Sequence, residues 1–395
     1  MHIGKILTGL PLCVSLASPA TAGLADRTIQ PMLLPVGDSE LKVDALAGGA
    51  VMAADQPGED KAATGVAKLM PRLHRDYDSG MVLSLNGTFT LADPLSRGRY
   101  TNPIEKLFGE MQTGLGKVQI GLADGAGYAL GLTGPKANAQ IALEDAQISF
   151  FRDPVTHRAV TNMFALRTAV GSSYNFGKIS YLSPNVFGVQ LGFSYTPSEG
   201  KQLPFMNTGP NVPGRQTDMF ELALRYAFDL GPVTVNTYLA GAEAHGERKL
   251  PGQQGLSDLG AGLRIDYPVG DSTTVSLGGS YRTTNAYAFD INRAYAGATT
   301  RALHVSAGLT DGDWSASLEY GNGVAGAVSP LGATGARLGQ NGVEVSVGYA
   351  LSPGVQLSTG WQHLNYGRGS GSFYDGSRKL SLDAVFLHLT ARTTD

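Results

Sequence analysis

The chain has 395 residues, and 30 Lys and Arg against 33 Asp and Glu give a formal net charge of −3. Only 16% of the residues are charged, below the ~25% of an ordinary soluble domain, and 53 glycines are nearly twice the usual share of about 7%. Apolar residues reach 42%, too few for a chain of helical membrane spans, and the near-neutral charge argues against a nucleic-acid partner.

The first 22 residues have the layout of a secretory signal peptide. Lys5 precedes an apolar stretch, and small residues end in Ala20-Thr21-Ala22, which is an A-x-A cleavage site. The apolar stretch is too short to span a bilayer as a helix. We therefore predict export and removal of residues 1–22. The single cysteine, Cys13, lies in this part, so the mature chain carries no thiol for disulfides or metal ligation.

Residues 23–77 differ from the rest of the chain. They contain four prolines and many small residues, and they show no clean period. We interpret them as an irregular periplasmic extension with a short helix near residues 62–69. Two apolar runs, residues 32–36 and 49–53, leave open that part of this region supplies strands.

Residues 78–392 alternate between apolar and polar side chains with a period of two, which is typical of half-buried strands. Leu259, Leu263 and Tyr267, for example, alternate with Gly260 and Arg264. The segment 173–182 is less regular, because its apolar face switches, and this suggests a bulge. Fourteen strands are readable, at residues 80–92, 105–114, 117–124, 173–182, 186–196, 216–229, 232–243, 257–267, 272–284, 300–310, 312–321, 341–351, 354–365 and 379–391.

Short turns and long loops alternate between these strands, as in an antiparallel up-and-down meander. A soluble β-sandwich would also alternate, but it would need charged or proline-marked edge strands, and none is evident. Aromatic residues gather at strand ends, and the polar face carries ionised side chains that a packed core would not accept unpaired. The pattern therefore predicts an all-β fold, a transmembrane β-barrel whose apolar face meets lipid and whose polar face meets a wet lumen.

The longest barrel loop, residues 125–172, is the candidate constriction. A barrel of fourteen or more strands has an open lumen unless a segment folds into it. Charges on this loop would face arginines on the lumen side of the wall and create a transverse field that filters solutes. The candidate residues are Glu144, Asp145, Arg152, Asp153 and Arg158 on the loop, which also carries Arg167, and Arg225, Arg264 and Arg282 on the wall.

One strand–turn–strand stretch, residues 178–197 (KISYLSPNVFGVQLGFSYTP), resembles Gram-negative outer-membrane porins of alphaproteobacterial type. Arg152-Asp153-Pro154 in the long loop and Gly360-Trp361 on a late strand are similar to porin sequences as well. The resemblance covers about residues 77–391. It implies a barrel of about sixteen strands in the outer membrane, a homotrimer in contact with lipid and lipopolysaccharide, and passive diffusion of small hydrophilic solutes and ions.

The chain departs from the porin pattern at two points. Porins usually end in an aromatic residue, whereas this chain ends in Thr394-Asp395. Fourteen readable strands are also two fewer than the family norm, and the long loop follows the third of them rather than the fifth.

Two other functions stay open at this point. A substrate-selective channel for sugars or anions would share the barrel, and an outer-membrane hydrolase would use a histidine such as His304 or His388 beside a nucleophile. None of the seven histidines lies in a recognisable catalytic motif, and no metal-spaced cluster or cofactor motif is present. We therefore predict a diffusion porin that is not an enzyme and has no cofactor and no metal.

Overall fold

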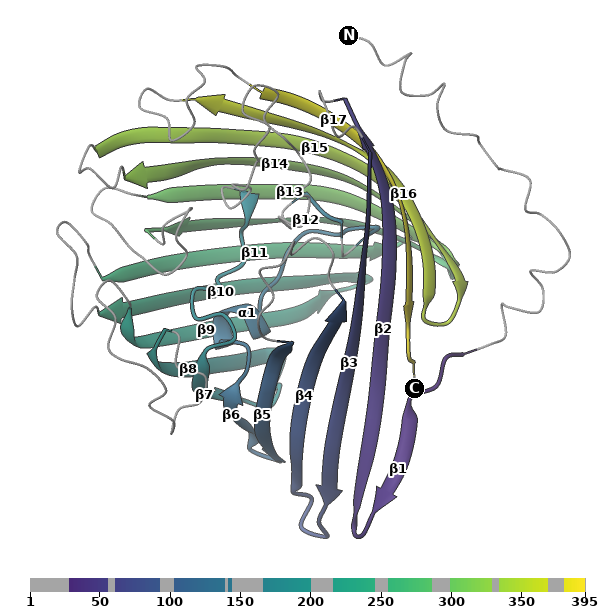
Figure 1. Cartoon of the computed structure of the whole chain (residues 1–395), viewed down its shortest axis with the longest axis vertical. Coiled ribbons are helices and arrows are strands. Elements are labelled where there is room, and N and C mark those ends of the chain that lie inside the picture. The colour runs from purple at the N-terminus through teal and green to yellow at the C-terminus, as the bar shows by residue number, and fades with distance from the viewer. Residues whose placement is uncertain are drawn as a thin grey trace, which may run out of the picture.

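The computed structural model describes residues 28–55, 61–92, 103–138, 141–143, 166–199, 216–245, 255–285, 299–328, 334–368 and 380–394. In these ranges the chain forms seventeen strands and one short helix, and every pair of neighbouring strands is antiparallel (Figure 1). The elements are β1 Met32–Val36, β2 Ser39–Ala54, β3 Lys61–Asp76, β4 Val82–Ala92, β5 Ile104–Thr113, β6 Gly116–Leu122, α1 Ala126–Ala129, β7 Gly177–Leu182, β8 Val189–Ser198, β9 Thr217–Leu230, β10 Val233–His245, β11 Leu256–Pro268, β12 Thr273–Thr284, β13 Thr300–Asp311, β14 Trp314–Val328, β15 Thr334–Ser352, β16 Val355–Arg368 and β17 Leu380–Arg392.

Strands β2 to β17 close into a sixteen-stranded barrel. Each strand pairs with the next one in the chain, and β17 pairs with β2 from Ala384↔Ala54 to Arg392↔Leu46. Beyond this point the first half of β2 pairs with the short strand β1, so β1 continues the line of β17 along the same edge. A hydrogen bond from the Thr393 amide to the Ala45 carbonyl (3.0 Å) joins the two stretches of pairing. Closure removes the open edge that a sheet of this size would otherwise present.

All fourteen strands predicted from alternation are confirmed. The interpretation of residues 23–77 as an irregular extension with a helix near 62–69 is wrong, because β1, β2 and β3 occupy that range. β2 and β3 bring the wall to sixteen strands, the number that the porin resemblance implies. They also place the long loop after the fifth barrel strand instead of the third. The predicted signal peptide, residues 1–22, lies outside the described residues.

The second half of β2 lacks a period-two pattern because both of its faces are apolar. Its inward side chains Ala50, Met52 and Ala54 are buried in a hydrophobic cluster inside the barrel, together with Leu143 and Phe386 among others. Its outward positions there include Ala47, Gly49 and Val51, so no polar residue alternates with an apolar one. In the first half, polar and apolar residues do alternate, but only from Glu40 to Ala45. β3 is continuous, but its ladder to β4 is interrupted between Leu69 and Arg72, around Pro71, which lacks the amide that a ladder needs.

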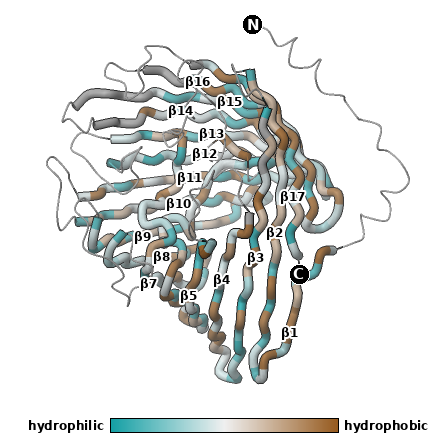
Figure 2. The backbone as a smooth tube through the Cα atoms, in the orientation of Figure 1, coloured by the Kyte–Doolittle hydropathy of each residue, from teal (hydrophilic) through white to brown (hydrophobic). Residues whose placement is uncertain are grey.

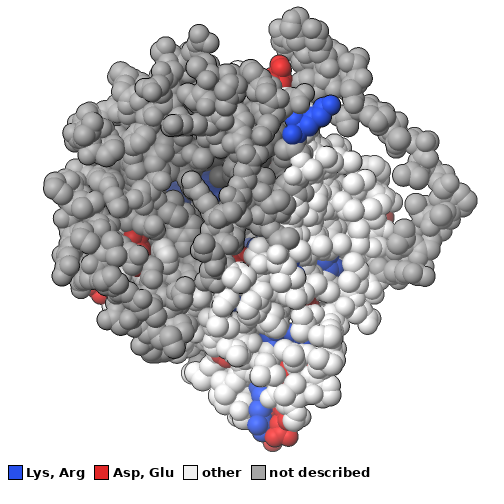
Figure 3. All heavy atoms as spheres, viewed as in Figure 1, with Lys and Arg blue, Asp and Glu red and all other residues white. Residues whose placement is uncertain are grey.

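Along the other strands the wall alternates as predicted. On β11 the outward Leu259 is 54% exposed, whereas the preceding inward residue, Asp258, is 0% exposed. The tube in Figure 2 changes between hydrophilic and hydrophobic at short intervals along these strands. On the visible face of β1 to β5, charged atoms are sparse, and they gather at the lower tip, near the ion pair of Arg75 and Asp38 (Figure 3). The outer face therefore has the apolar character that contact with lipid requires.

Aromatic side chains gather at the short-turn end of the barrel, as the sequence predicts. Trp314 on β14 and Tyr349 on β15 face each other with ring centroids 4.7 Å apart, and Tyr226 stacks on Phe228 at 5.0 Å. Such rings anchor a barrel at the level of the lipid headgroups. In the described part of the chain, no helix is both long and apolar enough to cross a bilayer.

Between β6 and β7, the described residues 123–138, 141–143 and 166–176 lie inside the barrel; we call them the inward segment. Its helix α1 lies within the ring of strands in Figure 1. Residues 173–176, assigned to a bulged strand from the sequence, belong to this segment; β7 begins at Gly177, which explains the switch of the apolar face.

The inward segment follows the inner wall from β8 to β17. Leu132 packs on Gly262 of β11, and Pro135 packs on Gly308 of β13. The Ala137 amide donates to Ser317 Oγ of β14 (2.9 Å), and Asn138 Nδ2 donates to Ser358 Oγ of β16 (2.8 Å). Over these strands, more than half of the circumference, the described residues of the inward segment form a second layer inside the wall.

Candidate functional site

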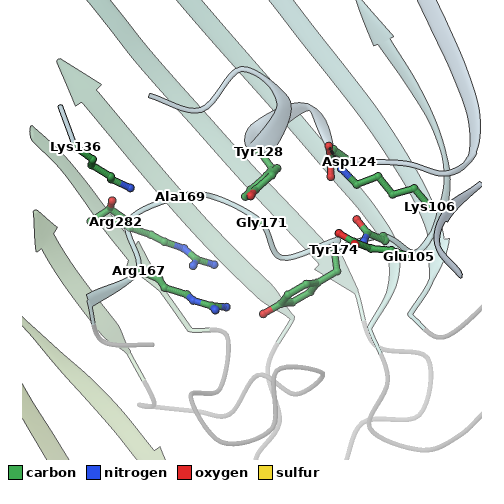
Figure 4. A pocket seen from close by; sticks show the side chains of 13 residues that line it. Glu105, Lys106, Asp124, Tyr128, Lys136, Arg167, Ala169, Gly171, Tyr174 and Arg282 are labelled. Carbon is green, nitrogen blue, oxygen red and sulfur yellow. Dashed lines mark hydrogen bonds and ion pairs between the residues drawn. The ribbon is translucent and has the colours of Figure 1, made fainter. Parts of the chain in front are cut away.

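The open lumen beside the inward segment contains a pocket of about 370 Å³. One side is formed by β5 and by Asp124, directly after β6, and the other by later residues of the inward segment and by Arg282 near the end of β12 (Figure 4). Its lining residues are Glu105, Lys106, Asp124, Gly125, Tyr128, Lys136, Arg167, Thr168, Ala169, Gly171, Tyr174, Asn175 and Arg282.

A bulge in β5 directs two neighbouring charges into this pocket. Lys106 pairs with Thr88 and Ile104 with Phe89, so Glu105 is the extra residue of the bulged strand. A regular strand would direct Glu105 and Lys106 to opposite faces, and a bulge re-aims one of them. Both now line the pocket, in which Lys106 Nζ lies 2.6 Å from Asp124 Oδ2. Glu105 Oε2 accepts from Lys68 Nζ at the same distance, 2.6 Å.

Three cationic side chains lie on the opposite side: Lys136 and Arg167 from the inward segment and Arg282 from β12 (Figure 4). Arg282 is held in place by the fully buried carboxylate of Asp258 on β11. Its Nε lies 2.8 Å from Asp258 Oδ1, and its Nη2 lies 2.6 Å from Asp258 Oδ2. Ser172 Oγ donates to the same carboxylate, which ties the guanidinium to the inward segment. A bidentate pair of this kind fixes both the position and the orientation of the arginine.

Charges of opposite sign thus flank the pocket, and Tyr128 and Tyr174 lie between the two groups in Figure 4. Glu105 and Asp124 are on one side together with Lys106, and Lys136, Arg167 and Arg282 are on the other. Such an arrangement produces an electric field across the pore, which orients water and sorts solutes by charge and dipole. Among the described residues, no three His, Cys, Asp or Glu side chains converge in a way that could hold a metal ion.

Of the wall arginines predicted from the sequence, Arg282 lines the pocket, and Arg225 and Arg264 do not. Arg264 lies nearer the short-turn end of β11, where its Nε is 2.8 Å from Asp266 Oδ1. Arg225 Nη2 donates to Asn236 Oδ1 on β10 at 3.3 Å. Both side chains belong to the inner side of the wall, because they alternate with the exposed Leu224 and Leu263. Their place opposite the constriction loop stays a prediction. Glu144, Asp145, Arg152, Asp153 and Arg158 lie outside the described residues.

Four charged pocket residues were not singled out from the sequence: Glu105, Lys106, Asp124 and Lys136. The β5 bulge has no signal in a single sequence, because residues 104–113 read as an ordinary strand. Asp124 and Lys136 flank α1 at the start of the long loop. Only the path of the backbone along the wall shows which side of the lumen they reach.

Comparison with known proteins places this geometry in a family. A family model described as Gram-negative porin matches residues 38–369. OmpT, an outer membrane protein of Vibrio cholerae, has a similar structure, with a TM-score of 0.58 at 10% identity over 91% of this chain and 99% of that one.

Two further solved structures share the fold. They are OmpF of Salmonella typhi in complex with daunomycin (TM-score 0.57, 13% identity, 91% and 100% of the two chains) and an anion-selective porin from Comamonas acidovorans (0.54, 13%, 90% and 99%). The comparison with curated protein sequences gives no match.

The match to the family model covers far more than half of the chain, and the described strands form the sixteen-stranded barrel of the porin-fold neighbours. The predicted function and location are thereby confirmed: the protein is a diffusion channel in the outer membrane of a Gram-negative bacterium. The chain belongs to the Gram-negative porin family.

Proposed function

We propose that the inward segment and β5 form the constriction of a general diffusion pore, through which small hydrophilic solutes and ions pass down their gradients. The pocket between them carries this proposal, since it is a space of about 370 Å³, enough for several water molecules, with charges on two sides. A pore of this kind needs no bound cofactor and no catalytic group. The absence of a catalytic motif around the histidines supports a channel that is not an enzyme.

The charges on the two sides would act as a filter. Arg167 and Arg282 favour anions, whereas Glu105 and Asp124 favour cations, so removal of either group should change selectivity in opposite directions. The loop residues Glu144, Asp145, Arg152, Asp153 and Arg158 stay predictions of the same filter.

Reversal potentials in a potassium chloride gradient across planar bilayers test the proposal. Glu105→Gln should shift the reversal potential toward anion preference, and Arg167→Gln should shift it toward cation preference. Arg264→Gln is the matched control, because Arg264 is also a wall arginine but does not line the pocket. If neither pocket variant differs from Arg264→Gln, the filter is not at this pocket.

The same recordings separate a general pore from a substrate-selective channel. A general pore should have a large ohmic conductance that neutral sugars reduce only in proportion to their effect on bulk conductivity. A block that saturates at low solute concentration would instead establish a binding site and refute the general pore.

We further propose that the protein is a homotrimer embedded in lipid and lipopolysaccharide. OmpT of Vibrio cholerae, which has a similar fold, has been solved in a trimer form. The apolar outer face of the wall supports contact with lipid. Native mass spectrometry from detergent should give three times the mass of the mature chain, and a monomer mass alone would contradict the trimer.

A further inference from the structure

Two buried charges lie where the inward segment leaves and rejoins the wall, and neither lines the pocket. Lys178 on β7 is 0% exposed, and Glu221 on β9 is 1% exposed. The neighbouring side chains Ile179, Phe220 and Leu222 are exposed on the outer face, so Lys178 and Glu221 point into the barrel. Burial of two ionised groups is costly unless each of them is paired and hydrogen-bonded.

Lys178 links the two ends of the inward segment. Its ammonium donates to the Ala123 carbonyl (2.6 Å), at the start of the segment, and to the Ser173 carbonyl (3.2 Å) and the Tyr174 carbonyl, near its end. These are the three hydrogen bonds that an ammonium group can donate, so its capacity is fully used on backbone carbonyls.

Glu221 links the same two ends through backbone amides. Its Oε2 accepts from the Gly127 amide (3.2 Å) in α1, and its Oε1 accepts from the Ser173 amide (3.2 Å). Ser194 Oγ on β8 donates to Oε2 as well (3.1 Å). The carboxylate therefore accepts hydrogen bonds from amides at both ends of the segment, just as the ammonium donates hydrogen bonds to carbonyls at both ends.

The neighbouring backbone leaves room for this arrangement. A Cβ atom on Gly125 would collide with the Glu221 carboxylate and with Ser173 Oγ, so only glycine lets the chain pass here. The opposite charges of Lys178 and Glu221 also attract one another across this junction. Both ends of the segment are thus joined to each other and to the wall by one pair of charges.

We propose that Lys178 and Glu221 are positioning residues that set the aperture of the pore by holding the base of the inward segment closed against the wall. The proposal rests on the inference that this segment forms the constriction. Without Lys178, three backbone carbonyls lose a donor in a buried place, and the Glu221 carboxylate loses a nearby opposite charge. The two ends of the segment can recover hydration only if they separate and admit water.

The experiment compares Lys178→Met, Glu221→Gln and the conservative Lys178→Arg with wild type in single-channel recordings. Removal of one member of a buried pair of charges costs enough free energy to raise the population of states with a displaced inward segment on the order of 100-fold. We therefore expect strong open-channel noise and sub-conductance steps in Lys178→Met and Glu221→Gln. Liposomes with these variants should also admit larger neutral oligosaccharides. Lys178→Arg keeps the charge and the donors and should restore most of the wild-type behaviour.

Arg264→Gln is the matched control, because it removes a wall cation whose ion-pair partner, Asp266, lies on the same strand and not on the inward segment. The heat-dependent gel shift of the barrel reports folding separately. If Lys178→Met does not fold, Glu221→Gln and Ser194→Ala, which removes a single partner of Glu221, carry the test.

A folded Lys178→Met or Glu221→Gln pore with the noise and the size limit of wild type would overturn the proposal. This outcome is distinct from failure of the charge filter. The filter is judged by reversal potentials of Glu105→Gln and Arg167→Gln, and the positioning role by noise and by passage of neutral solutes.

Discussion

Replacement of Gly262 by alanine should narrow the pore without the introduction of any charge. Gly262 lies on the lumen face of β11, directly below the Leu132 carbonyl of the inward segment. A Cβ atom at this position would lie 2.5 Å from the Leu132 oxygen, whereas real Cβ contacts essentially never fall below 3.0 Å. The segment must therefore move away from the wall by at least about half an ångström, toward the open lumen. Overpacking of this kind costs about 1–3 kcal/mol.

Single-channel conductance in planar bilayers measures the effect. We expect a lower conductance for Gly262→Ala and a still lower one for Gly262→Val, with the reversal potential unchanged. Gly109→Ala on β5 is the control, because a Cβ atom there has no atom within 4 Å. A Gly262→Ala conductance equal to that of Gly109→Ala would refute the reasoning, since it would mean that the inward segment does not limit the current.

Two further predictions concern the lipid face and the Arg282 site. Leu222 lies in the middle of β9 and is 63% exposed, and Leu230 lies at the rim and is 61% exposed. Leu222→Arg should lower the free energy of unfolding from lipid vesicles by about 2–4 kcal/mol, whereas Leu230→Arg should lower it by at most about 1 kcal/mol. Equal losses would contradict a lipid-facing position for Leu222. Arg282→Gln strands the buried Asp258 carboxylate and should destabilise the fold by about 3–5 kcal/mol, measured in the same unfolding assay. Arg282→Gln should also shift the reversal potential toward cation preference. An unchanged reversal potential would show that Arg282 does not contribute to the charge filter.

The strands that could be predicted are those whose outer face is large and apolar and whose inner face is polar or small. On β9 and β11 this difference gives an alternation that a single sequence displays, as with Leu259 and Asp258, although the inward segment covers part of their inner face. The second half of β2 could not be recognised, because its inner face is apolar as well. Ala50, Met52 and Ala54 pack there with apolar side chains such as Leu143, so the alternation disappears. A strand with two apolar faces has no periodic signal that distinguishes it from other apolar segments.

The site was predictable only in outline. A loop long enough to enter the lumen and a wall that carries Arg282 are visible in the sequence, and Arg282 does reach the pocket. Arg264 is equivalent in pattern, because it too alternates with outward residues on the same strand pair, yet it pairs with Asp266 and does not line the pocket. Height along the barrel axis depends on strand register and tilt, which the side-chain pattern does not encode.

By itself, then, the sequence of this protein determined a membrane-spanning barrel of antiparallel strands, because period-two alternation is a direct consequence of a wall between lipid and water. Only the tertiary structure decided the number of strands and the residues of the constriction. Glu105 enters the pocket through a bulge in β5, and Lys136 enters it through the path of the inward segment along the wall. Both depend on contacts between residues far apart in the chain, and such contacts leave no period in the sequence.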